Sequence, residues 1–415
     1  MGFSRGTVRR ATQGLRLGSL LLLLGACSTA PGGQATTSSS PTAPQTRTVA
    51  VGIGPQDMVL NPATHTLYTV SDPEHGFYGS VSVLDASTCN ALRASGCQGH
   101  TPSVQVGIGP GALAVDQATD TVYVVNSSSN TVSVINGATC NAQRTAGCGR
   151  TPLVINLPEY PADVSVNQAT GTVYVANWGN GAGTTVSVID GRTCNAHVAS
   201  GCQQVPAHVT VGTGPAGVFV DQSTDTVYAA TVAPSGAEAV SVIDGATCNA
   251  TTTSGCRRKP PSVNVGQGSA EYNVAFAIDQ ATGTLYVANW ADNTLSMIDK
   301  TSCNATVTSG CAQPSRVVRV GRGPDGVAID SATHTVYVAN VTSDTVSVFD
   351  AATCNAAVSS GCNTSRSRLL RTGKAPKWVA TDQASNTVYV SNGDDGTASL
   401  LNGATCNATV VSGCH

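Results

Sequence analysis

The cysteines are the residues whose spacing most clearly indicates chemistry. Fourteen of the fifteen form seven pairs, each eight positions apart, and Asn-Ala follows the first member of every pair. Zinc sites usually space paired cysteines about two to four residues apart and often add histidine, and redox sites usually use Cys-x-x-Cys. Neither pattern is present, whereas one local disulfide per pair agrees with the even number and with export. The predicted disulfides are Cys89–Cys97, Cys140–Cys148, Cys194–Cys202, Cys248–Cys256, Cys303–Cys311, Cys354–Cys362 and Cys406–Cys414.

Carboxylates are the second group that could carry chemistry. Asp57, Asp163, Glu271 and Asp325 occur at related places in the sequence, and no histidine accompanies them. They could hold a divalent cation, because hard ions prefer oxygen ligands. The chain has no Gly-x-Ser-x-Gly elbow, no His-Glu-x-x-His motif and no phosphate-binding loop. We therefore assign no catalytic residue, no metal ligand and no cofactor from the sequence.

The elements that must position these residues are short strands. In one repeat, four runs rich in Val, Ile, Tyr and Thr cover 103–107, 112–116, 121–126 and 131–136, with turn residues between them. No segment keeps a helical period. Seven such repeats of four antiparallel strands predict an all-β fold, a seven-bladed β-propeller over residues 47–415. A solenoid would need distinctive end caps, which the sequence lacks.

The repeat carries a recurring motif. Tyr-Val-Ala-Asn occurs at 174–177, 286–289 and 337–340, with variants in the other four repeats. With the preceding Gly-x-Gly-Pro and the following Thr-Val-Ser-Val-Ile-Asp, it resembles the YVTN β-propeller repeat family. The resemblance covers nearly all of residues 47–415 and implies the propeller fold. It implies no single activity, because that family includes surface proteins, enzymes and binding proteins.

The phase of the repeats predicts how the ring closes. Residues 47–52 match the fourth strand of the repeat, and the chain ends after a third strand and a cysteine loop. The N-terminal strand can therefore complete the last blade and leave no open edge. The alternative is that residues 47–52 form only a lead-in to the first blade.

One face of the propeller is expected to carry the function. The cysteine loops share one face and are nearly uniform, while the opposite face varies between repeats and holds all three tryptophans. Aromatic rings beside polar groups are common in ligand and protein contacts, although they could instead only pack loops together. The candidate binding residues on this face are Tyr160, Trp178, Glu271, Tyr272, Trp290, Lys377 and Trp378.

The N-terminus predicts export and a lipid anchor. Four arginines without an acidic residue precede a short apolar run that ends in Leu-Gly-Ala-Cys, which resembles a bacterial lipobox. This implies a signal peptide over residues 1–26 and lipidation of Cys27; an ordinary secretory signal is the alternative. Residues 27–46 have the composition of a flexible tether.

These observations favour a non-catalytic binding or interaction scaffold, anchored by lipid at the cell surface or the periplasmic side. We expect a protein or glycan ligand, a monomeric state and no nucleic-acid partner, because the net charge is −3 and no basic face is evident. The alternative is a lactonase-like or lyase-like propeller enzyme with a site over the central channel.

Overall fold

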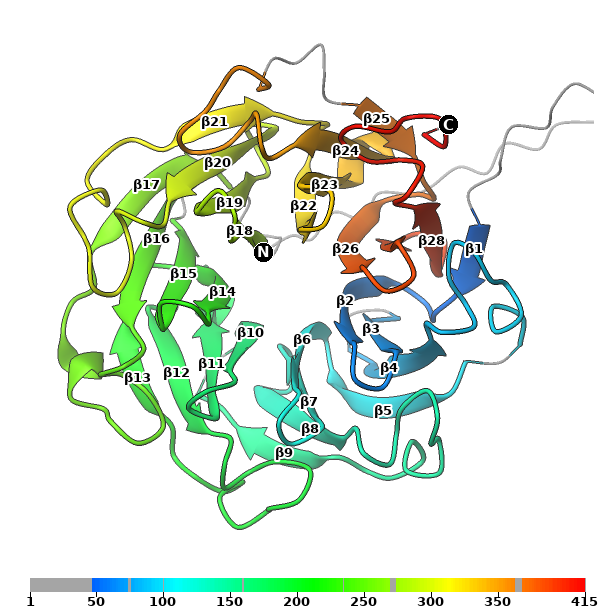
Figure 1. Ribbon diagram of the computed structural model, residues 1–415. Helices are drawn as coiled ribbons and strands as arrows, with labels where there is room; N and C mark the ends of the chain where they lie inside the picture. The colour runs from blue at the N-terminus through cyan, green and yellow to red at the C-terminus, as the bar shows by residue number, and fades with distance from the viewer. Residues whose placement is uncertain are drawn as a thin grey trace, which may run out of the picture. The chain divides into compact units, whose positions relative to one another are not determined.

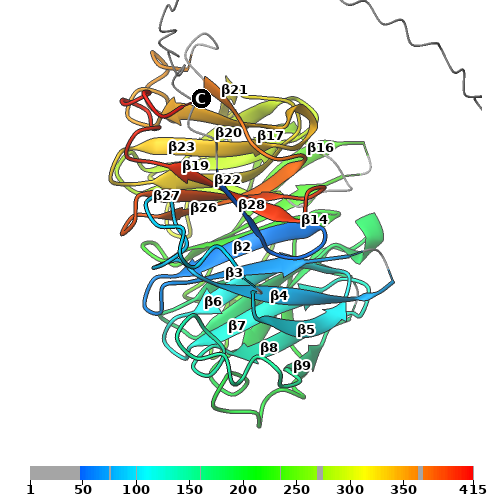
Figure 2. The same ribbon diagram turned by 90° about the vertical axis from the view of Figure 1, so that its right-hand side faces the viewer.

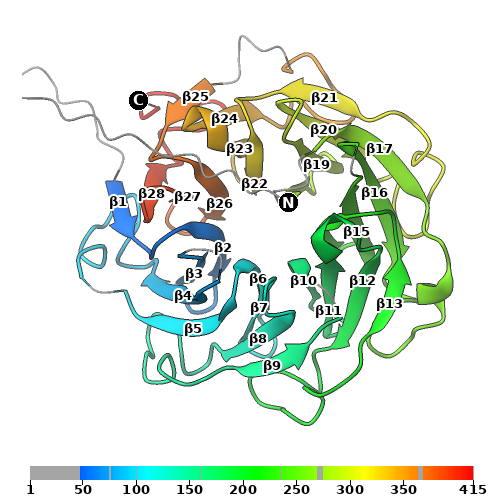
Figure 3. The ribbon, with the colours of Figure 1, turned by 180° about the vertical axis from the view of Figure 1, so that it is seen from behind.

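The computed structural model describes residues 47–73, 76–99, 101–158, 160–233, 235–268, 274–362 and 368–414. This part of the chain forms seven four-stranded antiparallel sheets arranged as the blades of a ring, seen from its two faces in Figures 1 and 3. The predicted seven-bladed propeller is confirmed. The predicted signal peptide, the predicted lipidation site Cys27 and the predicted tether lie outside the described residues.

Each blade uses its strands in chain order from the centre outward, except the seventh (Figure 1). The inner strands are β2 (Pro55–Asn61), β6 (Pro110–Asp116), β10 (Pro161–Asn167), β14 (Pro215–Asp221), β18 (Phe276–Asp279), β22 (Pro324–Asp330) and β26 (Pro376–Asp382). The second strands are β3 (Thr66–Ser71), β7 (Thr121–Asn126), β11 (Thr172–Asn177), β15 (Thr226–Val232), β19 (Thr284–Asn289), β23 (Thr335–Asn340) and β27 (Thr387–Asn392). The third strands are β4 (Tyr78–Asp85), β8 (Thr131–Asn136), β12 (Thr185–Asp190), β16 (Ala237–Asp244), β20 (Thr294–Asp299), β24 (Thr345–Asp350) and β28 (Thr397–Asn402). The outer strands are β5 (Ser103–Ile108), β9 (Leu153–Asn156), β13 (Ala207–Thr210), β17 (Ser262–Gln267), β21 (Arg316–Arg319), β25 (Arg368–Arg371) and, in the seventh blade, β1 (Arg47–Ala50). Three short 3-10 turns cover Gly179–Gly181, Gly255–Arg257 and Val341–Ser343.

The hydrophobic pattern of each strand follows its place in the blade. The second strands are buried along their whole length, as in β7 and β11, because blades pack against both of their faces. Outer strands such as β9 and β21 bury one residue in four. The β-branched and aromatic residues of the second strands suit this two-sided burial.

The core consists of layers between adjacent blades. In one layer Tyr68 and Val70 of the first blade pack with Leu113 and Val115 of the second blade. Another layer joins residues of the first and seventh blades, including Val49 and Tyr389. Each blade therefore depends on both neighbours for the burial of its apolar faces.

A tyrosine hydroxyl links every blade to the next at the cysteine loops. Each repeat tyrosine is fully buried and donates a hydrogen bond to the carbonyl oxygen of the first cysteine in the following blade. The seven bonds are Tyr68 to Cys140, Tyr123 to Cys194, Tyr174 to Cys248, Tyr228 to Cys303, Tyr286 to Cys354, Tyr337 to Cys406 and Tyr389 to Cys89, all 2.7–2.9 Å long. The last of these joins the seventh blade to the first.

The structure also explains the Asn-Ala that follows the first cysteine. In the second blade the Asn141 amide donates to the carbonyl of Gly137 and accepts from the backbone N–H groups of Gln143 and Arg144. The N–H of Ala142 donates to the hydroxyl of Thr66 in the preceding blade at 2.9 Å. The Asn thus shapes the loop and the Ala N–H attaches it to the neighbouring blade, and the same bonds recur around the ring.

All seven predicted disulfides are present, with Cα atoms 4.7–4.8 Å apart. Six of them close the loop between the third and fourth strands of a blade, and Cys406–Cys414 closes the equivalent segment that follows β28. Because such bonds persist in oxidising compartments, the seven disulfides indicate an extracytoplasmic environment.

The turns between inner and second strands use recurring polar residues. The Asp116 carboxylate accepts hydrogen bonds from the Ala118 N–H and the Thr119 hydroxyl, and equivalent aspartates do the same in four other blades. His65 and His334 occupy the position of these turns where φ is positive, 48° and 50°. Both residue types therefore serve turn geometry.

The N-terminal strand closes the ring as predicted. β1 pairs antiparallel with β28, and the two lie side by side in Figures 1 and 2. The strand ends at Ala50 rather than residue 52, but the Val51 N–H still donates to the Gly396 carbonyl. Val49 and Val51 are both buried in the layer between the first and seventh blades.

Candidate functional site

The candidate site is a cavity of about 600 Å³. It lies where the inner strands begin. The Gly-Pro turns that enter these strands lie on the face opposite the cysteine loops. Six of the seven blades contribute to its lining; the corresponding residues of the fifth blade, 269–273, lie outside the described part. The lining residues are Gln56, Asp57, Asp72, Gly109, Pro110, Gly111, Ser127, Ser128, Tyr160, Ala162, Trp178, Asn180, Ala216, Asp325, Lys377 and Trp378.

Aromatic rings from two separated blades line this cavity. Tyr160 and Trp178 of the third blade form an edge-to-face pair with ring centroids 5.4 Å apart. Trp378 comes from the seventh blade, where its backbone N–H donates to the Ser391 hydroxyl. Both tryptophans are partly buried and also pack against interblade core layers. The rings therefore combine loop packing with a surface open to the cavity.

Two carboxylates near the cavity connect neighbouring blades. Asp57 accepts a hydrogen bond from the Leu113 N–H of the second blade at 2.9 Å. Asp163 accepts from the Val218 N–H of the fourth blade and from its own neighbour Val164, both at 2.8 Å. Leu113 and Val218 occupy the same position of the repeat. Asp57 and Asp163 thus tie inner strands together, and only Asp57 lines the cavity.

Asp325 differs from these two. It is 6% exposed, lines the cavity and makes no hydrogen bond to a described residue. Burial raises its pKa to about 7, and the charge of Lys377 opposes that shift. Lys377 occupies the position of the seventh blade that Asp325 occupies in the sixth.

The charges of neighbouring carboxylates affect the pKa of Asp57. Burial raises the pKa of Asp57 well above its usual range; the N–H of Leu113 opposes this, and the charges of Asp163 and Asp325 add to it. Burial also raises the pKa of Asp163 to about 7, against the hydrogen bonds from Val218 and Val164. Three of the four carboxylates proposed from the sequence therefore gather near the channel mouth, and Glu271 lies outside the described residues.

The structure brings together four of the seven candidate binding residues: Tyr160, Trp178, Lys377 and Trp378. Trp290 does not line the cavity, and Glu271 and Tyr272 lie outside the described residues. Sequence comparison missed Gln56, Asp72 and Asn180. Gln56 could have been found, because three other repeats have Ala or Gly at its position after the strand-opening proline.

A second unusual carboxyl lies on the same face. Glu238 at the start of β16 is 4% exposed, and neither of its oxygens has a hydrogen-bond partner among the described residues. Burial raises its pKa to about 9, and the charge of Asp292 adds to the shift. A side chain at Gly268 would collide with it, since an added Cβ would lie 1.8 Å from Oε1.

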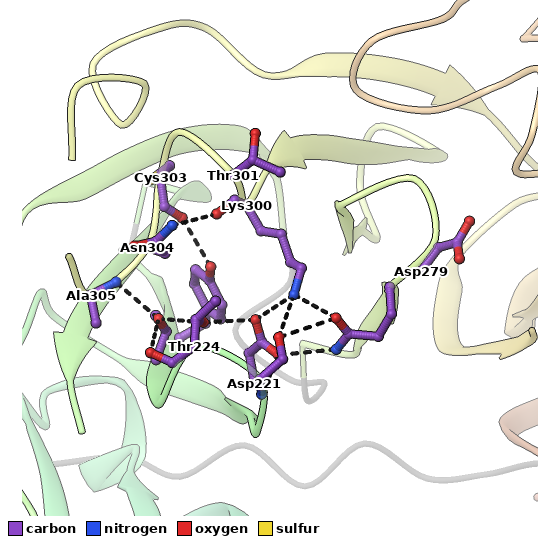
Figure 4. A network of polar contacts seen from close by, with 12 residues as sticks. Asp221, Thr224, Asp279, Lys300, Thr301, Cys303, Asn304 and Ala305 are labelled. Atoms are coloured by element: carbon purple, nitrogen blue, oxygen red, sulfur yellow. Dashed lines mark hydrogen bonds and ion pairs between the residues drawn. The ribbon is translucent and has the colours of Figure 1, made fainter. Parts of the chain in front are cut away.

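A buried ion pair connects the fourth and fifth blades on the face opposite the cavity (Figure 4). The Lys300 ammonium donates to the Asp221 carboxylate and to the Ser223 hydroxyl, each at 2.7 Å, and to Gln280. Burial alone would raise the pKa of Asp221, but the ammonium and the other donors lower it to about 2. Every other repeat has Ala or Gly where this one has Lys300. The pair joins two blades and does not line the cavity described above, so we assign it a structural role.

Within the described part of the chain, no three His, Cys, Asp or Glu side chains form a cluster that could hold a metal ion. Among the same residues, no helix has the length and apolar character needed to span a membrane.

Comparison with known proteins supports the fold. No family model and no curated protein matches the chain. A solved structure of Kuenenia stuttgartiensis hydrazine synthase is similar, with a TM-score of 0.63 and 18% sequence identity over 85% of this chain and 96% of that chain. At this identity the likeness concerns the fold alone.

Proposed function

We propose that this protein is an exported, lipid-anchored propeller of YVTN type that binds a small polar ligand in the cavity at the channel mouth. The observation that carries the proposal is the lining itself. Two tryptophans, a tyrosine and several carboxylates converge there from different blades. A volume of about 600 Å³ is typical of small-molecule sites, which are usually about 300–1,000 Å³.

The hydrogen bonds that the polar lining groups already make favour binding over catalysis. Asp57 accepts a backbone hydrogen bond, and the Ser127 hydroxyl donates to the Pro161 carbonyl at 2.6 Å. Neither Ser127 nor Ser128 has a hydrogen bond to a base among the described residues. A nucleophile paired with a base is the usual sign of covalent catalysis.

Export and anchoring rest on separate observations. The lipobox-like sequence ending at Cys27 supports a lipid anchor, and the seven disulfides support folding outside the cytoplasm. The cavity would then face ligands outside the cell or in the periplasm.

The enzyme alternative keeps one specific support. Asp325 has a pKa of about 7 and lines the cavity, and a carboxyl with such a pKa suits general acid–base catalysis. Turnover of lactone substrates that is lost in Asp325→Asn would favour this alternative over simple binding.

The test uses the purified mature protein and calorimetric titration with defined compounds: quaternary ammonium salts, neutral saccharides, organic acids and calcium chloride. We expect at least one class to bind, with affinity reduced at least tenfold in Trp178→Ala and Trp378→Ala. Trp290→Ala is the matched control, because this tryptophan shares the face but not the cavity. Equal binding by all four proteins, or no binding of any class, would contradict the proposed site.

A further inference from the structure

We propose that the ligand of this cavity is a small organic cation, held by Asp325 and Asp57 and by the faces of Trp178 and Trp378. This inference rests on the proposed function and specifies the ligand that the cavity takes. It goes beyond the protein or glycan ligand expected from the sequence.

The first argument is the charge of the cavity wall. Asp57 and Asp325 line the cavity, Asp163 lies close enough to raise the pKa of Asp57, and Lys377 is the one basic side chain among the described lining residues. Burying ionised carboxylates in such excess is unfavourable unless they take up protons or a positive charge accompanies them. A cationic ligand would supply that charge, whereas an anion would add to the repulsion.

One carboxylate in the cavity wall, Asp325, accepts no hydrogen bond from a described residue. Asp325 is almost fully buried, lines the cavity and makes no hydrogen bond to a described residue. Asp57 and Asp163, in contrast, each accept backbone N–H groups from a neighbouring blade. Asp325 interacts with the charge of Lys377 but accepts no hydrogen bond from a described residue, so its oxygens can accept one from a ligand ammonium.

The third argument is the aromatic lining. Trp178 and Trp378 come from different blades, and Tyr160 packs edge-on against Trp178. Tryptophan faces attract ammonium groups through the ring quadrupole, by about 0.5–2 kcal/mol depending on desolvation. A carboxylate beside such rings selects an ammonium group over a neutral group of the same shape.

The fourth argument concerns size, and it separates an organic cation from a metal ion. A cavity of about 600 Å³ is far larger than a metal site, and the described residues hold no cluster of three metal-binding side chains. The space instead fits an ammonium group that carries several carbon atoms.

The experiment compares choline with its uncharged isostere 3,3-dimethylbutan-1-ol by calorimetric titration of the mature protein. Choline should bind at least tenfold more tightly than the alcohol. Asp325→Asn should weaken choline binding at least tenfold without lowering the melting temperature, because Asp325 accepts no hydrogen bond from the described part of the chain. Asp394→Asn, an exposed position outside the lining, is the control.

Two further measurements sharpen this test. Lys377→Met should tighten choline binding, because it removes a positive charge from the lining. Choline should also bind more weakly at about pH 5.5 than at about pH 8, since Asp325, with a pKa of about 7, must be ionised. Burial raises the pKa of Asp325 and the charge of Lys377 opposes that shift, while the charges of Asp325 and Asp163 in turn raise the pKa of the neighbouring Asp57.

The outcomes separate the two proposals. Binding of saccharides or of calcium chloride, but not of choline, would overturn the organic cation and leave the binding cavity in place. Equal affinity for choline and the neutral alcohol would overturn it as well. If no compound of any class binds, both proposals are wrong.

Discussion

A buried tyrosine hydroxyl is one of the groups that hold each cysteine loop to the preceding blade. We expect Tyr228→Phe to lower the free energy of unfolding by about 1–3 kcal/mol, because the buried carbonyl of Cys303 loses its donor. Denaturant unfolding measures this effect. Tyr78→Phe is the control, since Tyr78 is 62% exposed and should change stability very little. Equal stability of both variants would show that the hydroxyl does not matter.

The carboxyl of Glu238 should make stability depend on pH. Its pKa is about 9 in the folded chain, against 4.5 for an ordinary glutamate, so the unfolded chain loses the proton first as the pH rises. Stability is then lost progressively between these two values. We expect Glu238→Gln to raise the melting temperature more at about pH 8 than at about pH 5, as followed by thermal unfolding at both values. The same change at both would contradict the buried neutral carboxyl.

The Lys300–Asp221 pair should respond asymmetrically to substitution. Asp221→Asn leaves a buried ammonium without its opposite charge, which typically costs about 3–5 kcal/mol. Lys300→Gly restores the residue of other repeats, and Asp221 keeps its donors Ser223, Thr224 and Gln280. We therefore expect a clearly smaller loss in denaturant unfolding. Adding Lys300→Gly to Asp221→Asn should recover part of the stability, and an additive loss would contradict this explanation.

At the scale of the element, each disulfide acts on one loop between two strands. Replacing Cys248 and Cys256 together with Ala should lower the free energy of unfolding by about 2–3 kcal/mol, because the unfolded loop regains its freedom. The Asn249 hydrogen bonds to Gly245 and Thr252 should keep the loop folded at room temperature. Thermal unfolding of this variant with and without a reductant measures the contribution. A variant as stable as the wild type would assign the loop shape to Asn249 alone.

The strands could be predicted because their causes are local. Alternating β-branched residues and Gly-Pro turns indicate each strand, and the repeat fixes their order. The partners of recurrent residues could not be predicted in the same way. The sequence shows a tyrosine at the position of Tyr68 in every repeat. The acceptor of the Tyr68 hydroxyl, the Cys140 carbonyl, however, lies 72 residues away in the next blade. That contact depends on how blades pack, which no local pattern encodes.

The sequence predicted the face on which the cavity lies, but it did not predict all of the residues that line the cavity. Departures from the repeat identified Trp178, Lys377 and Trp378, which do line it. Trp290 occupies the same repeat position as Trp178 and lies on the same face, but it does not line the cavity. Asp57 and Asp163 share one repeat position, yet only Asp57 lines the cavity. The pairing with the second strand is irregular at both strand starts, so the repeat position alone does not determine which side chain lines the cavity.

At the scale of the whole molecule, the ring is closed by several kinds of contact. β1 supplies the outer strand of the seventh blade, Tyr389 donates to the Cys89 carbonyl, and Ser391 donates to the Gln56 carbonyl. The Ser71 and Ser82 hydroxyls both donate to the carbonyl of Val51. The N-terminal strand is thus bound to the first blade as well as to the last, so its removal should weaken both.

We expect a chain that begins at residue 53 to be less stable than one that begins at residue 45. The shorter chain loses the β1–β28 pairing and the burial of Val49 and Val51, and full burial of each valine is worth about 1.5–3 kcal/mol. The unpaired edge of β28 should also favour association between molecules. Adding a synthetic peptide of residues 45–54 should restore the melting temperature, because the peptide can pair with β28 as the strand does. The chain that begins at residue 45 is the control and should not respond to the peptide. Identical melting of the two chains would show that the seventh blade is stable with three strands, and that the Tyr389 and Ser391 contacts close the ring without β1.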